Sequence, residues 1–337
     1  MTARHPIHTG MWQFIIDSRQ PYGLGLDEKL LPQYLKELNY TTQMVGKWHL
    51  GFFREEYTPT FRGFDQHYGY FTGQLDYWTY WHKQFAVQVI ENHDISQPLF
   101  LYLAQVAPHG ANEYDPMQAP QETIDQLQHI ENENRRTFAE LDTSIGEIIS
   151  ALAAKGMLDN SIVVLSTDNG GAAAGFNLQA ASNWPLRGNK DTIWQAGVRG
   201  TACIWSPLLP ANPRVSLQVM HVQDWLPTLL GALGEVPNNS PHPLDGVNAW
   251  GALTNPDEFR SSSFVVHVTS RAFKPSDSAS AYRGHAPAMN NLAAREPEIL
   301  NQLMTILEAH NATLVPSRKE PVDPECNPKY YNDTWVS

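Results

Sequence analysis

The apolar residues of this chain follow two recurring patterns. Where they return every three or four positions they predict amphipathic helices, at residues 27–38, 134–155 and 296–310. Continuous apolar runs rich in β-branched and aromatic residues predict strands, at residues 40–45, 98–106, 161–166, 201–206 and 263–268. Asp27 is the expected N-cap of the first helix, and Gly156 is expected just past the end of the second. Two further helices are predicted, at residues 84–92 and 224–233.

The order of these elements predicts the fold class. Strands that alternate with helices are typical of an α/β fold with a mainly parallel sheet flanked by helices. Three segments break the alternation. Residues 52–81 are aromatic and without period, and we interpret them as a long functional loop. Residues 172–200 form a loop rich in Gly and Asn, and residues 272–290 have the composition of a linker.

The central predicted strand ends in the polar run Asp168-Asn169-Gly170-Gly171. The first two side chains offer a carboxylate oxygen and an amide oxygen, which are ligands that a hard cation prefers. The two glycines let the backbone turn and approach a ligand closely. The alternative is an ordinary turn, because Asp, Asn and Gly are common turn residues.

Cationic side chains follow the predicted strands as well. Lys47 and His49 follow one strand, His109 another, and Arg187 and Lys190 lie in the loop after the central strand. In parallel sheets ligands gather at the carboxyl ends of strands, so these groups indicate a pocket for a tetrahedral oxyanion such as sulfate or phosphate. Taken singly, each residue has an ordinary role. The lysines would be solvated, the histidines would cap or pack, and Arg187 would form a structural ion pair, the role we favour for it.

The composition of the chain limits the binding partners and the cellular compartments that can be expected for the protein. The formal net charge is −12 with no block of Lys and Arg, so nucleic acid is not an expected partner. No apolar run approaches membrane-spanning length, and residues 1–6 lack the apolar core of a signal peptide. The two cysteines form no disulfide framework, and Cys203, in an apolar run, is predicted to be a buried thiol. Four sequons permit glycosylation in the secretory pathway, at Asn39, Asn238, Asn311 and Asn332.

Several ordered motifs resemble those of the sulfatase family, and within it arylsulfatases of the B, I and J type. The run Gly46-Lys47-Trp48-His49-Leu50-Gly51 is similar to the second sulfatase signature. Further matching runs are Gly25-Leu26-Asp27-Glu28-Lys29-Leu30-Leu31-Pro32, Arg62-Gly63-Phe64-Asp65, Thr167-Asp168-Asn169-Gly170-Gly171, Asn183-Trp184-Pro185-Leu186-Arg187-Gly188 and Asp224-Trp225-Leu226-Pro227-Thr228. The resemblance implies an alkaline-phosphatase-like fold and hydrolysis of sulfate esters of glycans or of aryl sulfates, in the lysosome or outside the cell.

The resemblance also implies residue roles. Asp168 and Asn169 match two calcium ligands, and Lys47 matches a lysine that contacts both nucleophile and sulfate. His49 matches a histidine that orients the nucleophile. His109 and Lys190 match sulfate-binding groups near the leaving oxygen. The nucleophile of the family is a formylglycine made from the cysteine of a Cys-x-Pro-Ser-Arg motif.

Departures from the family pattern shape what we expect of this chain. Residues 1–10 resemble the segment just downstream of the nucleophile, so the cysteine and the first strand with its paired aspartates are expected to be missing, and Gly110-Ala111 replaces the family's His-x-Pro. Residues 1–270 then form an incomplete catalytic domain, and residues 271–337 a linker and a remnant of the C-terminal subdomain, where Cys326 lacks its partner. We expect the chain alone to be inactive and poorly stable.

Two alternatives stay open. One is a non-catalytic isoform that binds sulfated glycans or a partner. The other is a metal-dependent phosphotransferase of the same architecture, although such enzymes use Ser or Thr nucleophiles and more Asp and His ligands than this sequence offers.

Overall fold

The computed structural model of the protein describes residues 1–73, 75–76, 81–112, 114–173, 175, 179–216, 218–255 and 292–331. The chain divides into two compact units. The first unit comprises Met1–Asn160, Gln223–Asn248 and Val315–Ser337, and the second comprises Ser161–Val222 and Ala249–Leu314. The predicted domain boundary near residue 270 stays a prediction. Each unit is described by itself below.

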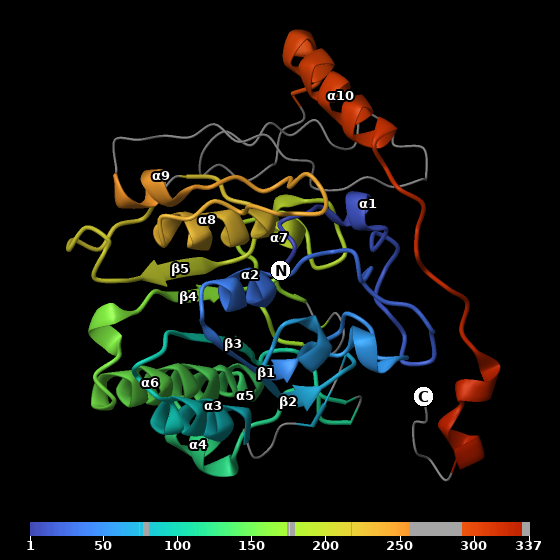
Figure 1. Ribbon diagram of the computed structural model, residues 1–337. Helices are drawn as coiled ribbons and strands as arrows, with labels where there is room; N and C mark the ends of the chain where they lie inside the picture. The colour runs from blue at the N-terminus through green and yellow to red at the C-terminus, as the bar shows by residue number, and fades with distance from the viewer. Residues whose placement is uncertain are drawn as a thin grey trace. The chain divides into compact units, whose positions relative to one another are not determined.

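The first unit is built on a parallel three-stranded sheet (Figure 1). Its central strand is β1 (Thr41–Lys47), which lies between β2 (Gln66–Tyr70) and β3 (Leu99–Ala104). Lys47 lies opposite Tyr70, and Gly46 lies opposite Ala104. Because both pairings are parallel, the carboxyl ends of all three strands lie at one edge of the sheet. The predicted parallel α/β architecture is therefore confirmed in this unit.

The strand β2 was not predicted. Residues 52–81 were interpreted as a loop, but besides β2 they hold two short 3₁₀ helices, η1 (Glu55–Tyr57) and η2 (Pro59–Arg62). The sequence of β2 is Gln-His-Tyr-Gly-Tyr, which has neither an apolar run nor an alternation of apolar and polar residues. Pairing with the buried β1 makes it a strand, since strand propensity depends on such context.

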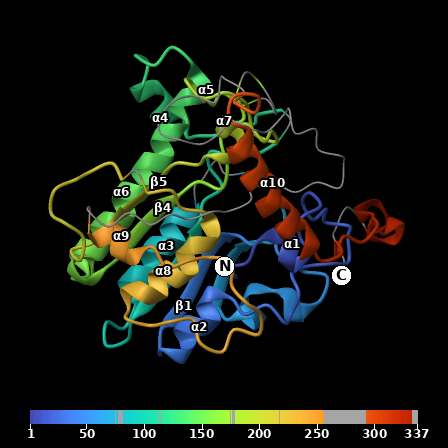
Figure 2. The same ribbon diagram turned by 90° about the horizontal axis from the view of Figure 1, so that it is seen from above.

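Helices cover both faces of this sheet. In Figures 1 and 2, α2 (Leu31–Glu37) lies on one side of β1, and α3 (Trp81–Asn92), backed by α6 (Phe138–Ala154), lies on the other. α8 (Trp225–Ala232) joins α2 through a shared apolar cluster that includes Leu31, Tyr34, Leu35, Leu226 and Leu230. The remaining helices of the unit are short: α1 (Pro6–Thr9), α4 (Gln121–Gln126), α5 (Glu133–Arg136), η3 (Leu158–Asn160), η7 (Pro324–Cys326) and η8 (Pro328–Tyr331).

Helix boundaries differ from the prediction in one informative place. α2 begins at Leu31, four residues after the predicted cap Asp27. The Gln33 side chain accepts a hydrogen bond from the Leu30 backbone N–H at 2.8 Å and so closes the helix start. Asp27 instead faces His242, 2.9 Å away. The predicted end of α6 is confirmed, because Gly156 follows the C-cap with a φ of +72°.

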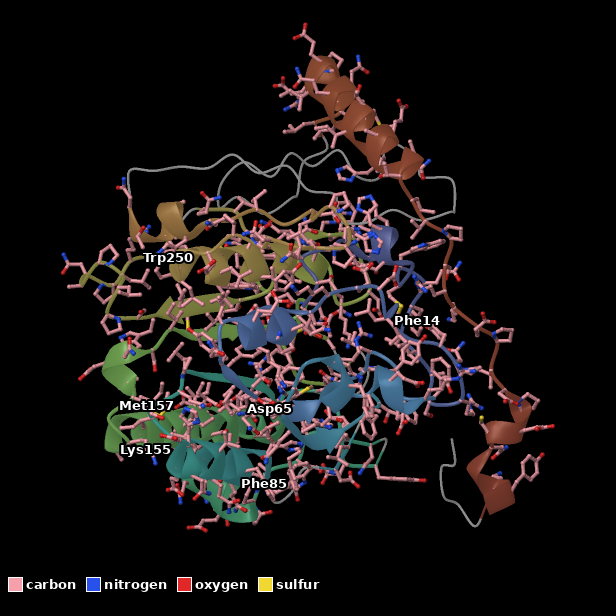
Figure 3. The ribbon with its side chains drawn as sticks, viewed as in Figure 1. Phe14, Asp65, Phe85, Lys155, Met157 and Trp250 are labelled. Atoms are coloured by element: carbon pink, nitrogen blue, oxygen red, sulfur yellow. The ribbon has the colours of Figure 1, made fainter. Side chains whose placement is uncertain are left out.

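The Arg62–Asp65 motif is a structural clamp. The buried Arg62 guanidinium donates to the backbone carbonyls of Leu24 at 3.0 Å, Gly25 at 3.1 Å and Glu28 at 2.9 Å. Asp65, labelled in Figure 3, accepts the Thr42 backbone N–H at 2.8 Å and the Lys36 ammonium at 2.6 Å. These contacts connect the segment before α2 and the start of β1 to the turn after η2. The role of the Arg62–Asp65 motif is therefore to stabilise the packing around β1.

The second unit contains an antiparallel ribbon of β4 (Val163–Ser166) and β5 (Ala202–Trp205), with Val163 opposite Trp205. Its helices are α7 (Gln195–Val198), α9 (Trp250–Thr254) and α10 (Pro297–Ala312), and η5 (Val222–Asp224) lies where the chain passes between units. The predicted strand at 263–268 and the predicted linker at 272–290 fall outside the described residues.

The prediction of a buried thiol at Cys203 is wrong. Cys203 is exposed, and so are its neighbour Ala202 and, at 45%, Trp205. A two-stranded ribbon cannot cover both of its own faces, so an apolar run does not guarantee burial there. Within the part of the chain that the structure describes, no helix has the length and apolar character needed to cross a membrane.

Candidate active site

The first group of predicted site residues lies at the carboxyl edge of the parallel sheet. Lys47 is the last residue of β1, and His49 follows two positions later with a φ of +60°. Gly46, one residue earlier, has a φ of +104°, and a Cβ there would lie 2.0 Å from the carbonyl oxygen of Ala104 on β3. Only glycine fits this position. The first residue of the Gly46–Gly51 motif is therefore glycine because β1 and β3 approach closely there.

Trp48 anchors the motif between the two cationic positions. Its side chain is buried at 5% exposure and packs edge-on against Phe64, with ring centroids 6.3 Å apart. Its indole Nε1–H donates to the carbonyls of Gly51 and Tyr57, both at 2.9 Å. The backbone N–H groups of Trp48 and His49 extend the pairing with β2 by donating to Tyr70 and Phe71. Lys47 and His49 are therefore carried on a rigid support.

The His49 ring is fixed by one hydrogen bond. Its Nε2 lies 2.8 Å from the Ile16 carbonyl oxygen, and because a carbonyl only accepts, Nε2 carries the proton. Burial lowers the pKa of His49, and electrostatic repulsion from Lys47 and His109 lowers it further, while the bond to Ile16 opposes the shift. Burial and the neighbouring Lys47 and His109 therefore favour the neutral form of the His49 ring.

His109 lies in a turn just beyond β3. Its backbone N–H donates to Val106 at 2.9 Å, and its Nδ1 lies 2.9 Å from the carbonyl oxygen of Gly110. Val106, Ala107 and Ala111 around it form a small buried cluster. The contact to Gly110 places the proton of a neutral ring on Nδ1, so a charged His109 would donate from Nε2.

The second group follows β4 in the second unit. Asp168 is exposed, and its Oδ1 accepts the backbone N–H of Asn169 at 2.8 Å. The Asn169 Nδ2 donates to the Gly170 carbonyl at 2.8 Å, which turns its Oδ1 away from that contact. Asp168 and Asn169 thus lie on one turn, and the side chain of each hydrogen-bonds to the local backbone.

Close backbone packing explains the two glycines of this turn. A Cβ on Gly170 would lie 1.6 Å from the carbonyl oxygen of Ala196, and one on Gly171 would lie 2.6 Å from the Ala181 Cβ. Asn183 braces the turn from outside, because its Oδ1 accepts from the Gly171 N–H at 2.9 Å and its Nδ2 donates to the Gly171 carbonyl at 2.8 Å. Asn169 and Asn183 thus use side-chain amides to fix the backbone.

Lys190 belongs to the same braced turn. Its backbone N–H donates to the Gly171 carbonyl at 3.2 Å, and among the described residues its half-buried side chain makes no hydrogen bond or ion pair. Arg187 differs, because its guanidinium lies 3.6 Å from the centre of the Trp194 ring. Arg187 therefore has a structural contact, but the partner is an aromatic ring, so the favoured ion pair was wrong.

The structure thus brings together two sets of residues. Lys47, His49 and His109 share the carboxyl edge of the first unit's sheet, and Asp168, Asn169 and Lys190 share one turn of the second unit. That the two sets meet around one anion stays a prediction.

Two histidines near this edge were missed. His67 on β2 donates from Nε2 to the Gly46 carbonyl at 3.1 Å, and burial lowers its pKa. His82 on α3 is 2% exposed, and burial lowers its pKa to about 4. Its Nε2 has no hydrogen-bond partner among the residues that the structure describes. His67 is missed because residues 52–81 are interpreted as one loop, and the Tyr-rich run at residues 66–71 is the available signal. His82 is missed because the predicted helix begins at residue 84, whereas α3 begins at Trp81.

The residues present suit calcium in kind but not in number. Asp168 and Asn169 offer two oxygen ligands, whereas Ca²⁺ takes six to eight. Among the described residues no group of three or more His, Cys, Asp or Glu side chains is arranged to hold a metal ion. The calcium pair Asp168 and Asn169 therefore stays a prediction, and a tight site would need further ligands.

Comparison with known proteins agrees with this architecture. The Sulfatase family model matches residues 1–235. The chain is 37% identical over 289 residues to arylsulfatase J of Mus musculus, covering 75% of this chain and 47% of that protein. It is 28% identical over 296 residues to N-acetylgalactosamine-6-sulfatase of Homo sapiens, covering 75% and 55%. The crystal structure of Ps i-CgsB in complex with k-i-k-neocarrahexaose superposes with a TM-score of 0.65 at 28% identity, covering 75% and 63%.

A parallel sheet flanked by helices, with polar groups at the carboxyl ends of its strands, defines an alkaline-phosphatase-like α/β protein. Within that class, the chain belongs to the sulfatase family. It spans about half the length of the curated relatives it matches.

Proposed function

We propose that the chain carries the anion-binding part of a sulfuric ester hydrolase that acts on sulfated glycans or aryl sulfates. The observation that carries this proposal is the grouping of Lys47, His49 and His109 on one rigid sheet edge in a chain of the sulfatase family. A preorganised cationic pocket suits a sulfate group because no reorganisation is needed as charge moves during transfer.

Each residue has a distinct part in this proposal. The ammonium groups of Lys47 and Lys190 hold the sulfate oxygens, and the half-buried His49 orients the group that attacks sulfur. His109, when charged, donates a proton from Nε2 to the departing sugar or phenol oxygen. Calcium at Asp168 and Asn169 would polarise the sulfate.

The attacking group is not found in this sequence. The 337 residues contain two cysteines, in the runs Ala202-Cys203-Ile204-Trp205 and Glu325-Cys326-Asn327-Pro328, and neither is a Cys-x-Pro-Ser-Arg motif. Removing a covalent nucleophile abolishes most turnover in enzymes that depend on one.

The sugar part of the substrate is suggested by the relatives. One matched protein is named for N-acetylgalactosamine 6-sulfate, and one matched structure holds a neocarrahexaose. Both support a sulfated sugar over a simple aryl sulfate. A lysosomal or secreted location is part of the proposal. It is supported by the exposure of three sequon residues, Asn39, Asn238 and Asn311; Asn332 lies outside the described residues.

The purified 337-residue chain is expected to bind inorganic sulfate without hydrolysing 4-nitrophenyl sulfate. Lys47→Ala is expected to weaken sulfate binding about tenfold, the size of one lost charge-assisted contact, in isothermal titration calorimetry. The control is Lys329→Ala, in the exposed C-terminal tail, which should bind sulfate normally. Hydrolysis that EDTA abolishes would contradict the expected inactivity, and absence of sulfate binding would contradict the proposed site.

Calcium is expected to bind the isolated chain weakly. With one carboxylate and one amide as ligands, the dissociation constant should exceed about 10⁻⁴ M, because affinity rises with the charge and number of ligands. Calcium titration followed by thermal shift measures it, with Asp168→Asn as the variant that should lose the response. A submicromolar constant would mean that other ligands complete the site.

A non-catalytic isoform that binds sulfated glycans or a partner is the alternative function. The missing Cys-x-Pro-Ser-Arg motif favours it. Sequencing the 5′ end of the transcript separates the two. An in-frame Cys-x-Pro-Ser-Arg run ahead of the Met1 codon would favour the enzyme, and its absence would favour the binder.

A further inference from the structure

One aromatic side chain beside the second set of site residues has no part in the function described so far. Trp184 is 88% exposed, although indole is among the largest apolar side chains. Among the described hydrogen bonds and ring contacts none involves its side chain. A role in packing is thus excluded, and Trp194, ten residues on, is the tryptophan that stabilises the loop by stacking on Arg187.

The backbone that carries Trp184 is held firmly. Its neighbour Asn183 makes two hydrogen bonds to Gly171, at 2.9 and 2.8 Å, and the Asn183 carbonyl accepts the Leu186 N–H at 2.7 Å. An indole on a tight, braced turn loses little conformational freedom when a ligand binds, since Trp has two side-chain torsions. Exposure combined with a rigid support is typical of an aromatic contact surface.

The residues on the same turn as Trp184 indicate which kind of ligand its indole would contact. Gly171, to which the Asn183 side chain is hydrogen-bonded, also accepts the backbone N–H of Lys190. Gly171 follows Asp168 by three positions and Asn169 by two. Three features therefore meet on one turn of the second unit: an aromatic face, an ammonium group and an acid–amide pair. A sulfated sugar has matching parts, because the C–H face of its ring is apolar and its sulfate is anionic.

We propose that Trp184 is a sugar-stacking subsite that takes the pyranose ring of the sulfated sugar whose sulfate group Lys190 contacts. This inference rests on the proposed function and narrows it to sulfated glycans. Small aryl sulfates and inorganic sulfate would use Lys190 without the full stacking surface.

The test compares two probes on the purified chain, inorganic sulfate and N-acetylgalactosamine 6-sulfate, by isothermal titration calorimetry. The sugar sulfate is expected to bind about tenfold tighter than sulfate, equivalent to about 1.4 kcal/mol of stacking. Trp184→Ala is expected to remove that advantage and leave sulfate binding unchanged, and Trp184→Phe to keep part of it. Lys190→Ala is expected to weaken both probes.

The matched control is Trp205→Ala. Trp205 is a half-exposed tryptophan of the same unit, but it pairs with Val163 at the start of β4, about four strand residues or roughly 13 Å from the turn. It should bind both probes like the wild type. With 5-fluorotryptophan incorporated, the ¹⁹F signal that Trp184→Ala removes should shift with the sugar sulfate and not with sulfate.

The outcomes separate the two proposals. If the wild type binds sulfate, and Trp184→Ala binds both probes as the wild type does, the stacking subsite is wrong and the anion site stands. If the wild type binds neither probe, the anion site fails and the subsite with it. Loss of sulfate binding in Trp184→Ala would mean that the indole supports the turn, which also overturns the subsite.

Discussion

Arg62→Ala is expected to lower the free energy of unfolding of the first unit by about 3 kcal/mol or more. The substitution removes three charge-assisted hydrogen bonds and leaves the buried carbonyls of Leu24 and Glu28 without a donor, and each such group costs about 1–3 kcal/mol. The Gly25 carbonyl keeps the hydrogen bond that it accepts from the Glu28 backbone N–H at 3.1 Å. Urea denaturation followed by circular dichroism measures the shift in midpoint.

The control for this change is Arg54→Ala. Arg54 is exposed, and among the described residues its side chain makes only a distant contact, 5.8 Å, with the Phe53 ring. Exposed substitutions of this kind change stability by about 0.5 kcal/mol or less. Equal midpoints for the two variants would show that the Leu24 and Glu28 carbonyls find other donors. Arg62→Lys should recover only part of the loss, because a lysine cannot span the three carbonyls with one planar group.

Stability is also expected to fall as the pH drops from about 6.5 to 4. Burial lowers the pKa of His82 from 6.5 to about 4, so between these values the unfolded chain takes up a proton that the folded chain does not. By linkage the folded state loses stability over this window, by about 3 kcal/mol in full, with no further loss from His82 below pH 4. The lowered pKa values of His49 and His67 add to the loss with the same sign.

His82→Leu is expected to flatten this part of the pH profile. Leucine removes the titrating group, and at pH 7 it also removes a buried Nε2 that lacks a partner, so stability there should be unchanged or slightly higher. His129→Leu, at an exposed position, is the control that should keep the wild-type slope. Thermal unfolding at half-unit pH steps gives the comparison, and an unchanged slope in His82→Leu would show that His82 is hydrated.

The fold could be predicted where burial sets a strong pattern. The strands β1, β3, β4 and β5 and the helices α3, α6, α8 and α10 are predicted close to their observed bounds, because each carries an apolar run or stripe in its sequence. The same pattern does not predict burial, since most of β5 is exposed and α10 has no buried residue. β2 was missed, since the residues of this strand gain their conformation from pairing with β1 and carry no apolar pattern of their own. The start of α2 was misplaced because a Gln33 side chain closes it where an acidic cap was expected.

The candidate site likewise has features that the sequence predicts and features that depend on tertiary packing. Lys47, His49, His109, Asp168, Asn169 and Lys190 were located from their place after strands and from family motifs, and the structure groups them within each unit. Contacts that depend on tertiary packing could not be predicted. The stack of Arg187 on Trp194, the two-way bracing of Gly171 by Asn183 and the exposed Trp184 all arise from how one loop folds on itself.

The indole of Trp48 links the Lys47–His49 motif to the segment that follows it. One N–H is shared by the carbonyls of Gly51 and Tyr57, on the aromatic segment that follows, while the same residue separates Lys47 from His49. A rearranged aromatic segment would therefore tilt both cationic side chains together. Substitutions in this segment that alter substrate choice must therefore keep the carbonyls of residues 51 and 57 at their present spacing. Residues after position 57 are not under this constraint.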